Sequence, residues 1–179
     1  MPSNKLRLYV ALYLRSGRAP PDSYHWALLV GPKKEDSPLD AMQYHVKNTI
    51  QPGVDGQPWM FEESRLDESS TRFRLLVRVL IAKIADPVKL PSSLRNVALI
   101  QNTPDWTCRV WVMEALSQLE LDGVLSPGRQ ISGWSEIEKE CRWYVDKKKA
   151  ENRWEVSKLR DADHGDPQSI KIPTWDLLR

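Results

Sequence analysis

Residues 103–119 carry apolar side chains at three- and four-residue steps, the spacing of one face of an α-helix. This stripe begins at a cysteine and comprises Cys108, Trp111, Val112, Ala115, Leu116 and Leu119. Thr103, Pro104 and Asp105 are typical of a helix start, which puts Cys108 within about the first turn. Because a helix with one apolar face must bury it, we expect this helix to pack on a sheet, with the thiol facing inward.

Most of the chain before this helix has the composition and alternation of β-strands. The expected strands are residues 6–14, 24–31, 42–47, 59–62 and 73–84. β-Branched residues favour strand over helix in the last of these runs, which we expect to be central. The polar segment 33–40 suits a hairpin, and residues 87–95 suggest a short helical turn. We therefore predict an α+β fold, in which a mostly antiparallel sheet packs against the cysteine-bearing helix.

The composition changes after residue 123, where Ser126, Pro127 and Gly128 interrupt the chain. A polar helix is predicted over residues 135–159. Its apolar stripe comprises Trp134, Ile137, Cys141, Tyr144 and Val145. Cys141 is therefore expected to be a core residue. From residue 161 onward we expect an irregular tail, and Trp175 and Leu177 could dock this tail on the rest of the domain.

The overall composition indicates one globular domain. The chain has 179 residues, of which 41% are hydrophobic and 28% charged, enough for one buried core. We expect residues 1–125 to form that core and residues 126–179 to pack on it as a C-terminal extension. A net charge of +2 gives no argument for a nucleic-acid partner, and the lysines at 147–149 suggest a solvated face.

The predicted location is the cytoplasm. The first residues lead directly into a strand pattern without a signal-peptide cleavage site, and no run approaches the roughly 18–20 apolar residues that span a bilayer. We therefore expect no membrane anchor, and expect both cysteines to be free thiols. The sequence leaves the oligomeric state open.

Two of the three histidines fall on predicted strands, His25 on 24–31 and His45 on 42–47, whereas His164 lies in a polar, turn-like stretch. A hairpin between the two strands would bring His25 beside His45. An imidazole can take the proton of a thiol, and a helix N-terminus stabilises both a thiolate and a developing oxyanion. Cys108, His25 and His45 are therefore candidates for a thiol nucleophile with its base. A small buried cysteine and hydrogen-bonded structural histidines are the alternative.

These residues also carry a resemblance to a known group. The run His-Trp-Ala-Leu-Leu-Val-Gly at residues 25–31, followed by His45 and by Cys108 at a helix start, resembles the lecithin–retinol acyltransferase and HRAS-like suppressor proteins. Those proteins belong to the circularly permuted branch of the NlpC/P60 papain-like superfamily. Together with residues 78–84 and the run Trp-Thr-Cys at 106–108, the pattern is similar to a fungal family of unknown function over roughly residues 6 to 120.

The resemblance implies a permuted NlpC/P60 fold and a role for each residue. Cys108 would be the nucleophile, His25 its base, and His45 the group that orients His25. The implied activity is a hydrolase or acyltransferase acting on an ester, thioester or amide without a cofactor. The chain departs from the acyltransferases at Thr107, where they carry asparagine, in the run 109–111, and in a longer segment at 32–43. Because no hydrophobic C-terminal anchor is found, we expect a small-molecule acyl substrate rather than a phospholipid.

Aromatic residues surround the proposed site in sequence. Tyr24, Trp26, Trp106 and Trp111 are expected near the thiol, where they would wall a substrate pocket, although core packing explains such residues equally well.

Two other functions stay open. Cys108, His25 and His45 form an acceptable zinc ligand set with an open fourth position. A binding module that keeps the fold without the chemistry is the other alternative.

Overall fold

The computed structural model describes residues 5–15, 19–20, 22–34, 39–50, 52–69, 74–127, 133–154 and 172–178. Six strands form one sheet in the order β4-β3-β2-β1-β5-β6. The strands are β1 (Leu6–Leu14), β2 (Tyr24–Pro32), β3 (Met42–Lys47), β4 (Met60–Arg65), β5 (Leu75–Lys83) and β6 (Thr174–Asp176). The helices are α1 (Leu90–Arg95), α2 (Cys108–Leu121) and α3 (Trp134–Ala150). The predicted α+β class and mostly antiparallel sheet are confirmed, since β6 alone pairs in parallel, with β5.

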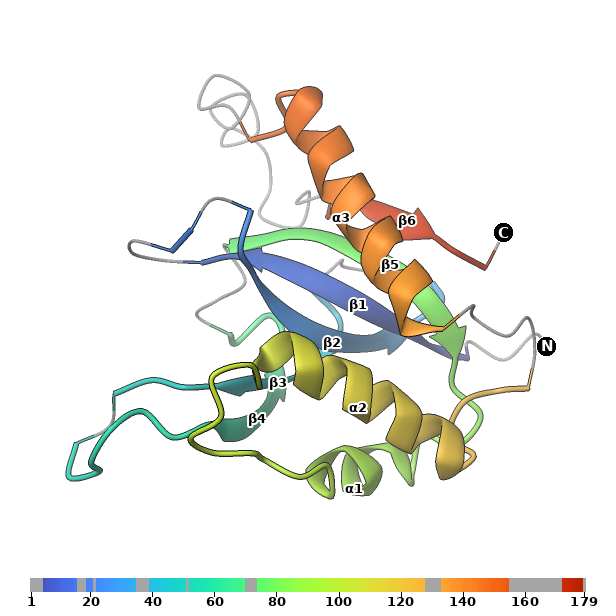
Figure 1. Ribbon diagram of the computed structural model, residues 1–179. Coiled ribbons are helices and arrows are strands. Elements are labelled where there is room, and N and C mark those ends of the chain that lie inside the picture. The colour runs from blue at the N-terminus through green and yellow to red at the C-terminus, as the bar shows by residue number, and fades with distance from the viewer. Residues whose placement is uncertain are drawn as a thin grey trace.

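The three helices cover one face of the sheet. In Figure 1, α2 lies over β2 and β3, α1 lies against α2, and α3 lies over β1 and β5. All three contribute to a single core cluster with Leu8, Leu12 and Leu28 of the central strands. Because side chains alternate along a strand, the intervening residues form a second apolar cluster on the opposite face, which includes Tyr13 and Ala27.

The pairing between β2 and β3 is short. These strands pair only between Leu28–Val30 and the facing residues Met42–Tyr44. Beyond that point β3 continues to pair with β4, as far as Lys47 opposite Met60. The start of β2, from Tyr24 to Ala27, therefore pairs with β1 on one side, and no strand of the described part of the chain pairs with it on the other. This gap is where α2 begins.

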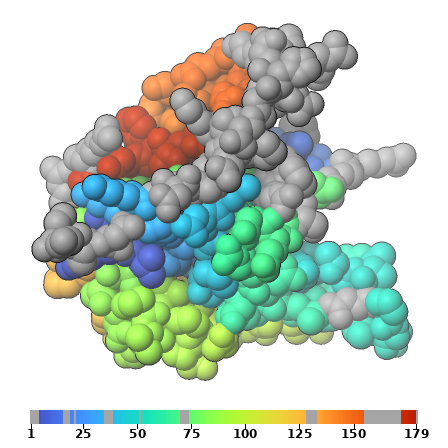
Figure 2. Space-filling view, turned by 180° about the vertical axis from the view of Figure 1, so that it is seen from behind, coloured from blue at the N-terminus to red at the C-terminus, as the bar shows by residue number. Residues whose placement is uncertain are grey.

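The loop between β3 and β4 projects from the molecule. Figures 1 and 2 both show it as an arm extending from the body, and Figure 1 shows it on the side of the molecule where α2 begins. Its positive-φ glycines, Gly53 and Gly56, provide the left-handed backbone of two turns. The arm returns at Trp59, whose backbone N–H donates to Gln101 Oε1 at 2.8 Å. Gln101 Nε2 donates to the Trp59 carbonyl in return, so the arm is tied to the segment before α2.

The two long helices differ from prediction at one end each. Helix α2 begins at Cys108, because Trp106 N–H closes a turn onto the Thr103 carbonyl and Thr107 is extended with φ −141°. Helix α3 ends at Ala150, short of the predicted 159, because Asn152 adopts a left-handed φ of 52°, which terminates a helix. Residues 155–159 lie outside the described part of the chain, as does His164.

The C-terminal part shares the core of the N-terminal part. Ile137, Cys141 and Val145 of α3 are buried in the same cluster as the sheet, and Cys141 is a buried free thiol. Strand β6 was not predicted; its three residues pair with β5, and Trp175 contacts Trp143 and Tyr144 of α3. None of the helices in the described residues is long and apolar enough to cross a membrane.

Candidate active site

Cys108 lies at the gap between β2 and β3. It is the first residue of α2, its side chain is 2% exposed, and its sulfur accepts the backbone N–H of Trp26 at 3.5 Å. A strand N–H points in the plane of the sheet toward its neighbouring strand. The sulfur therefore takes the position in which β3 would otherwise accept this hydrogen bond. Trp26 N is two covalent bonds from His25 Cα, so the sulfur lies within about 6 Å of that Cα.

His25 and His45 are joined by a short hydrogen bond. His25 Nε2 and His45 Nδ1 are 2.7 Å apart, and the two rings meet edge to face. His25 lies at the start of β2 directly opposite Tyr13 of β1, and is partly buried. His45 is 2% exposed. This contact leaves His25 Nδ1 as the ring nitrogen that no hydrogen bond from another described residue reaches.

The far side of His45 contacts two further polar side chains. His45 Nε2 is 3.1 Å from Glu62 Oε1 of β4, its cross-strand partner, and 3.1 Å from Gln43 Nε2 of its own strand. Glu62 also pairs with Lys47, and Gln43 Oε1 accepts the hydroxyl of Tyr13 at 2.7 Å. A continuous chain of contacts therefore runs from His25 through His45 to a carboxylate at the sheet edge.

The carboxylate determines the tautomer of both histidines. A carboxylate only accepts hydrogen bonds, so His45 Nε2 must carry a proton to bond Glu62. His45 Nδ1 then accepts from His25 Nε2–H, which leaves the lone pair of His25 on Nδ1. The Gln43 amide satisfies the same arrangement when its oxygen faces His45, since amide orientation is assigned from the hydrogen-bond network. In that orientation the Gln43 NH2 group donates to the Tyr13 hydroxyl, in place of the contact in which Oε1 accepts from it. In this tautomer His25 Nδ1 is the ring nitrogen that can accept a proton.

Burial keeps the thiol and imidazole uncharged. Desolvation, with smaller contributions from the adjacent His45 and from the Arg15 charge, lowers the pKa of His25 to about 3, and Glu62 opposes this shift. Desolvation also raises the pKa of the Cys108 thiol, against smaller opposing effects of the Trp26 N–H and of the Arg15 charge. The helix N-terminus was expected to stabilise a thiolate. Burial has the larger effect, because taking the thiolate out of water destabilises it more than the nearby N–H groups stabilise it.

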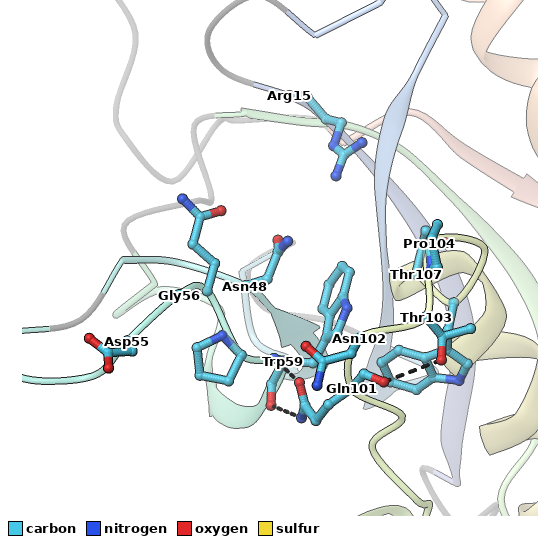
Figure 3. Close-up of a pocket in the computed structure, with 13 residues that line it drawn as sticks. Arg15, Asn48, Asp55, Gly56, Trp59, Gln101, Asn102, Thr103, Pro104 and Thr107 are labelled. Atoms are coloured by element: carbon cyan, nitrogen blue, oxygen red, sulfur yellow. Dashed lines mark hydrogen bonds between the residues drawn. The ribbon is translucent and has the colours of Figure 1, made fainter.

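An open cavity of about 780 Å³ adjoins the start of α2. It is lined by Arg15, Asn48, Asp55, Gly56, Gln57, Pro58, Trp59, Gln101, Asn102, Thr103, Pro104, Trp106 and Thr107. Figure 3 shows Arg15 on one side with its guanidinium pointing into the cavity, and Trp59 and Asn102 on the other. Thr107, which belongs to this lining, directly precedes Cys108 in the chain.

The predicted site residues fall into two groups. Cys108, His25 and His45 come together around the start of β2. Of the four aromatic residues expected to wall a pocket, Trp106 lines the cavity. Tyr24, Trp26 and Trp111 are buried in the core cluster instead, where Trp26 packs against Trp134 and Trp111 against Phe61.

Four residues of the site and of the cavity lining were not predicted from the sequence: Arg15, Gln43, Trp59 and Glu62. Gln43 lies two residues before His45, so strand alternation alone would have put both on one face. Glu62 lay inside a predicted strand, but its place opposite His45 depends on the register of β3 with β4, which the sequence does not specify. Arg15 and Trp59 flank strands at loop ends and carry no motif.

The zinc alternative finds no support in the donor geometry. Among the described residues, no three His, Cys, Asp or Glu side chains are arranged to hold a metal ion. His25 Nε2 and His45 Nδ1 point at each other at hydrogen-bond distance, so neither is directed at a shared ligand position with Cys108.

The fold and site together define an α+β protein with a six-stranded mixed sheet and a cysteine-and-histidine cluster where a helix begins at a gap in that sheet. Residues 5–179 match a family of unknown function, DUF6914, and the chain belongs to that family. No curated protein and no solved structure matches the chain.

Proposed function

We propose that the protein is a cysteine-dependent hydrolase or acyltransferase of the permuted NlpC/P60 type, acting on an ester, thioester or amide of a small molecule. One observation carries the proposal: the thiol accepts the N–H of Trp26, the residue after His25, while His25 Nε2 is held by His45. The free lone pair of His25 is then on Nδ1, and the sulfur lies within about 6 Å of the His25 Cα.

The reaction begins from the neutral pair. As the sulfur attacks the acyl carbonyl carbon, the S–C bond forms and His25 Nδ1 takes the thiol proton. The proton passes to the leaving alcohol, thiol or amine as its bond to the acyl carbon breaks, which leaves an acyl-enzyme on Cys108. Water or an acceptor amine or alcohol then attacks this thioester and gives its proton to His25. As the S–C bond breaks, His25 returns the proton to the sulfur and the thiol is regenerated.

The start of α2 supplies oxyanion donors. The first backbone hydrogen bond of this helix runs from Trp111 N to Thr107 O, so the N–H groups of the preceding residues have no partner within the helix. Those of Cys108 and Arg109 are turned toward the Cys108 sulfur, where they lower the pKa of its thiol. In the proposed reaction they donate to the oxyanion that forms when the sulfur attacks.

The proposal is tested with 4-nitrophenyl and thioester substrates of short acyl chains. We expect a burst of product and a mass increase of one acyl group on Cys108, located by peptide mapping. Cys108→Ser and His25→Ala should each lower kcat/KM by at least about 100-fold. Cys141→Ser is the matched control, because that thiol is buried in α3 away from the histidines, and it should keep wild-type activity. Turnover unchanged in Cys108→Ser would refute the proposal.

A non-catalytic binding module is the second candidate. The 2% exposure of Cys108 and the raised pKa of its thiol favour it, because an active thiol must be reached by its substrate. This alternative predicts no acyl adduct with any substrate of the panel. It also predicts that ligands bind equally well to wild type and to Cys108→Ser.

A further inference from the structure

The cavity beside the start of α2 has one cationic side chain in its lining, that of Arg15. Arg15 directly follows β1, two residues after Tyr13, which pairs with His25 across the strands. Its side chain is exposed, and it forms no ion pair with a carboxylate in the described residues. The Arg15 charge acts on both reacting groups, lowering the pKa of His25 and of Cys108.

The rest of the lining is polar and contains few charges. Four amide side chains and two threonine hydroxyls face two tryptophans and two prolines. The single carboxylate, Asp55, lies on the projecting loop at the edge of the cavity away from Arg15 (Figure 3). Gln101 already uses both amide atoms to hold Trp59, so the wall opposite Arg15 is preorganised.

We propose that the substrate is a polar acyl compound with an anionic group, a carboxylate being the simplest, which Arg15 binds while the acyl carbon meets Cys108. Guanidinium matches carboxylate geometry with two parallel hydrogen bonds. A cavity of about 780 Å³ is in the range of small-molecule sites and suits a compound of acylated amino acid or short peptide size. The amide-rich walls disfavour a long alkyl chain, which would leave these polar groups without partners. This inference rests on the proposed thiol chemistry.

The test uses two alkylating reagents of nearly equal shape, anionic iodoacetate and neutral iodoacetamide. Their rates at Cys108 are measured peptide by peptide at low salt, and their ratio is compared between variants. Because both reagents need the same thiol, a change in the pKa of Cys108 cancels in the ratio. We expect Arg15→Gln to lower the iodoacetate-to-iodoacetamide ratio at least about threefold, and Arg15→Lys to retain most of it.

Lys139→Gln is the matched control, since it removes one positive charge from an exposed position of α3 outside the cavity lining. It should leave the ratio unchanged. An equal ratio in wild type and Arg15→Gln would overturn the inference, and so would an equal loss in Lys139→Gln.

A second measurement separates this inference from the proposed function. The 4-nitrophenyl esters of butyric acid and of glutaric acid, which differ by a terminal carboxylate, are compared by kcat/KM. Preference for the glutarate ester that is lost in Arg15→Gln supports both claims. Hydrolysis of both esters without a preference leaves the thiol chemistry standing and overturns the anion site. A charge-dependent alkylation ratio without any hydrolysis overturns the proposed enzyme while retaining an anion site beside Cys108.

Discussion

At the scale of single residues, the site depends on which ring nitrogens of His25 and His45 form hydrogen bonds. His45 uses both ring nitrogens, one toward His25 and one toward Glu62 and Gln43. His25 uses one. A third group that fixes the ring and tautomer of a catalytic histidine is the arrangement that acid–base chemistry requires. In the mechanism that we propose, that function is shared between His45 and Glu62, a carboxylate of the neighbouring strand β4.

Glu62→Gln tests the outer end of this chain. The neutral amide gives up the charge-assisted bond to His45, so we expect kcat/KM to fall roughly tenfold with little change in KM. Glu62 raises the pKa of both histidines, so its removal should move the acidic limb of the pH profile to lower pH. Glu63→Gln is the control, because Glu63 pairs with Arg95 instead. An unshifted profile in Glu62→Gln would show that the carboxylate has no role in the site.

At the scale of elements, the gap between β2 and β3 decides where the thiol sits. Helix α2 reaches that gap because its buried stripe fixes it on β2 and β3. The stripe was predictable from spacing alone, as were five strands from their alternation. The point at which α2 begins was not, because the turn at Thr103–Trp106 is closed by a backbone hydrogen bond that no side chain signals.

Two leucines of α2 provide a matched pair for testing this packing. Leu119 is fully buried, whereas Leu121, two residues later in the same helix, is 83% exposed. Leu119→Ala should lower the free energy of unfolding by about 2–5 kcal/mol, since it removes buried methyl groups and leaves a cavity. Leu121→Ala should change it by less than about 0.5 kcal/mol. Urea denaturation measures both. Equal effects would mean that this face of α2 does not anchor the helix to the core.

The polar contacts between elements were the least predictable part. The hairpin of β2 and β3 brought His25 beside His45 as expected. The two strands do not pair at His25, so the histidines meet through their side chains across the gap. Glu62 reaches His45 only through the register of β4. Strand β6 joins the sheet by three residues, which are too few to show an alternation pattern. Sequence patterns therefore predicted the elements and two histidines, whereas the register between strands determined their partners.

At the scale of the whole molecule, the site places two uncharged histidines inside the fold. Burial lowers the pKa of both His25 and His45. An unfolded chain exposes them to water, where an imidazole titrates near its ordinary pKa of about 6.5. Folding stability is therefore coupled to pH through the same residues that form the site.

This coupling gives a signed prediction. Below pH 6.5 the unfolded chain protonates His25, whereas the folded protein keeps it neutral until about pH 3. The unfolded state binds more protons in this window, so acidification favours unfolding, and the penalty disappears above pH 6.5. Between pH 7 and pH 5, His25 should account for a loss of up to about 2 kcal/mol. In His25→Asn the urea midpoint should fall less over this range than in wild type; an identical fall would mean that folding does not shift the pKa of His25.

The central claim, that His25 takes the proton of Cys108, is tested most directly by alkylation with iodoacetamide between pH 5 and pH 7. Rates at Cys108 and Cys141 are read from separate peptides in wild type and His25→Ala, with circular dichroism confirming that the variant is folded. A thiol served by a neutral base reacts at a rate independent of pH, whereas an unassisted thiol reacts through its thiolate, about tenfold faster per pH unit. The account predicts a flat profile at Cys108 in wild type and a rising one in His25→Ala. Equal inertness of Cys108 and Cys141 in both proteins, or the same rising profile at Cys108 in both, would contradict it.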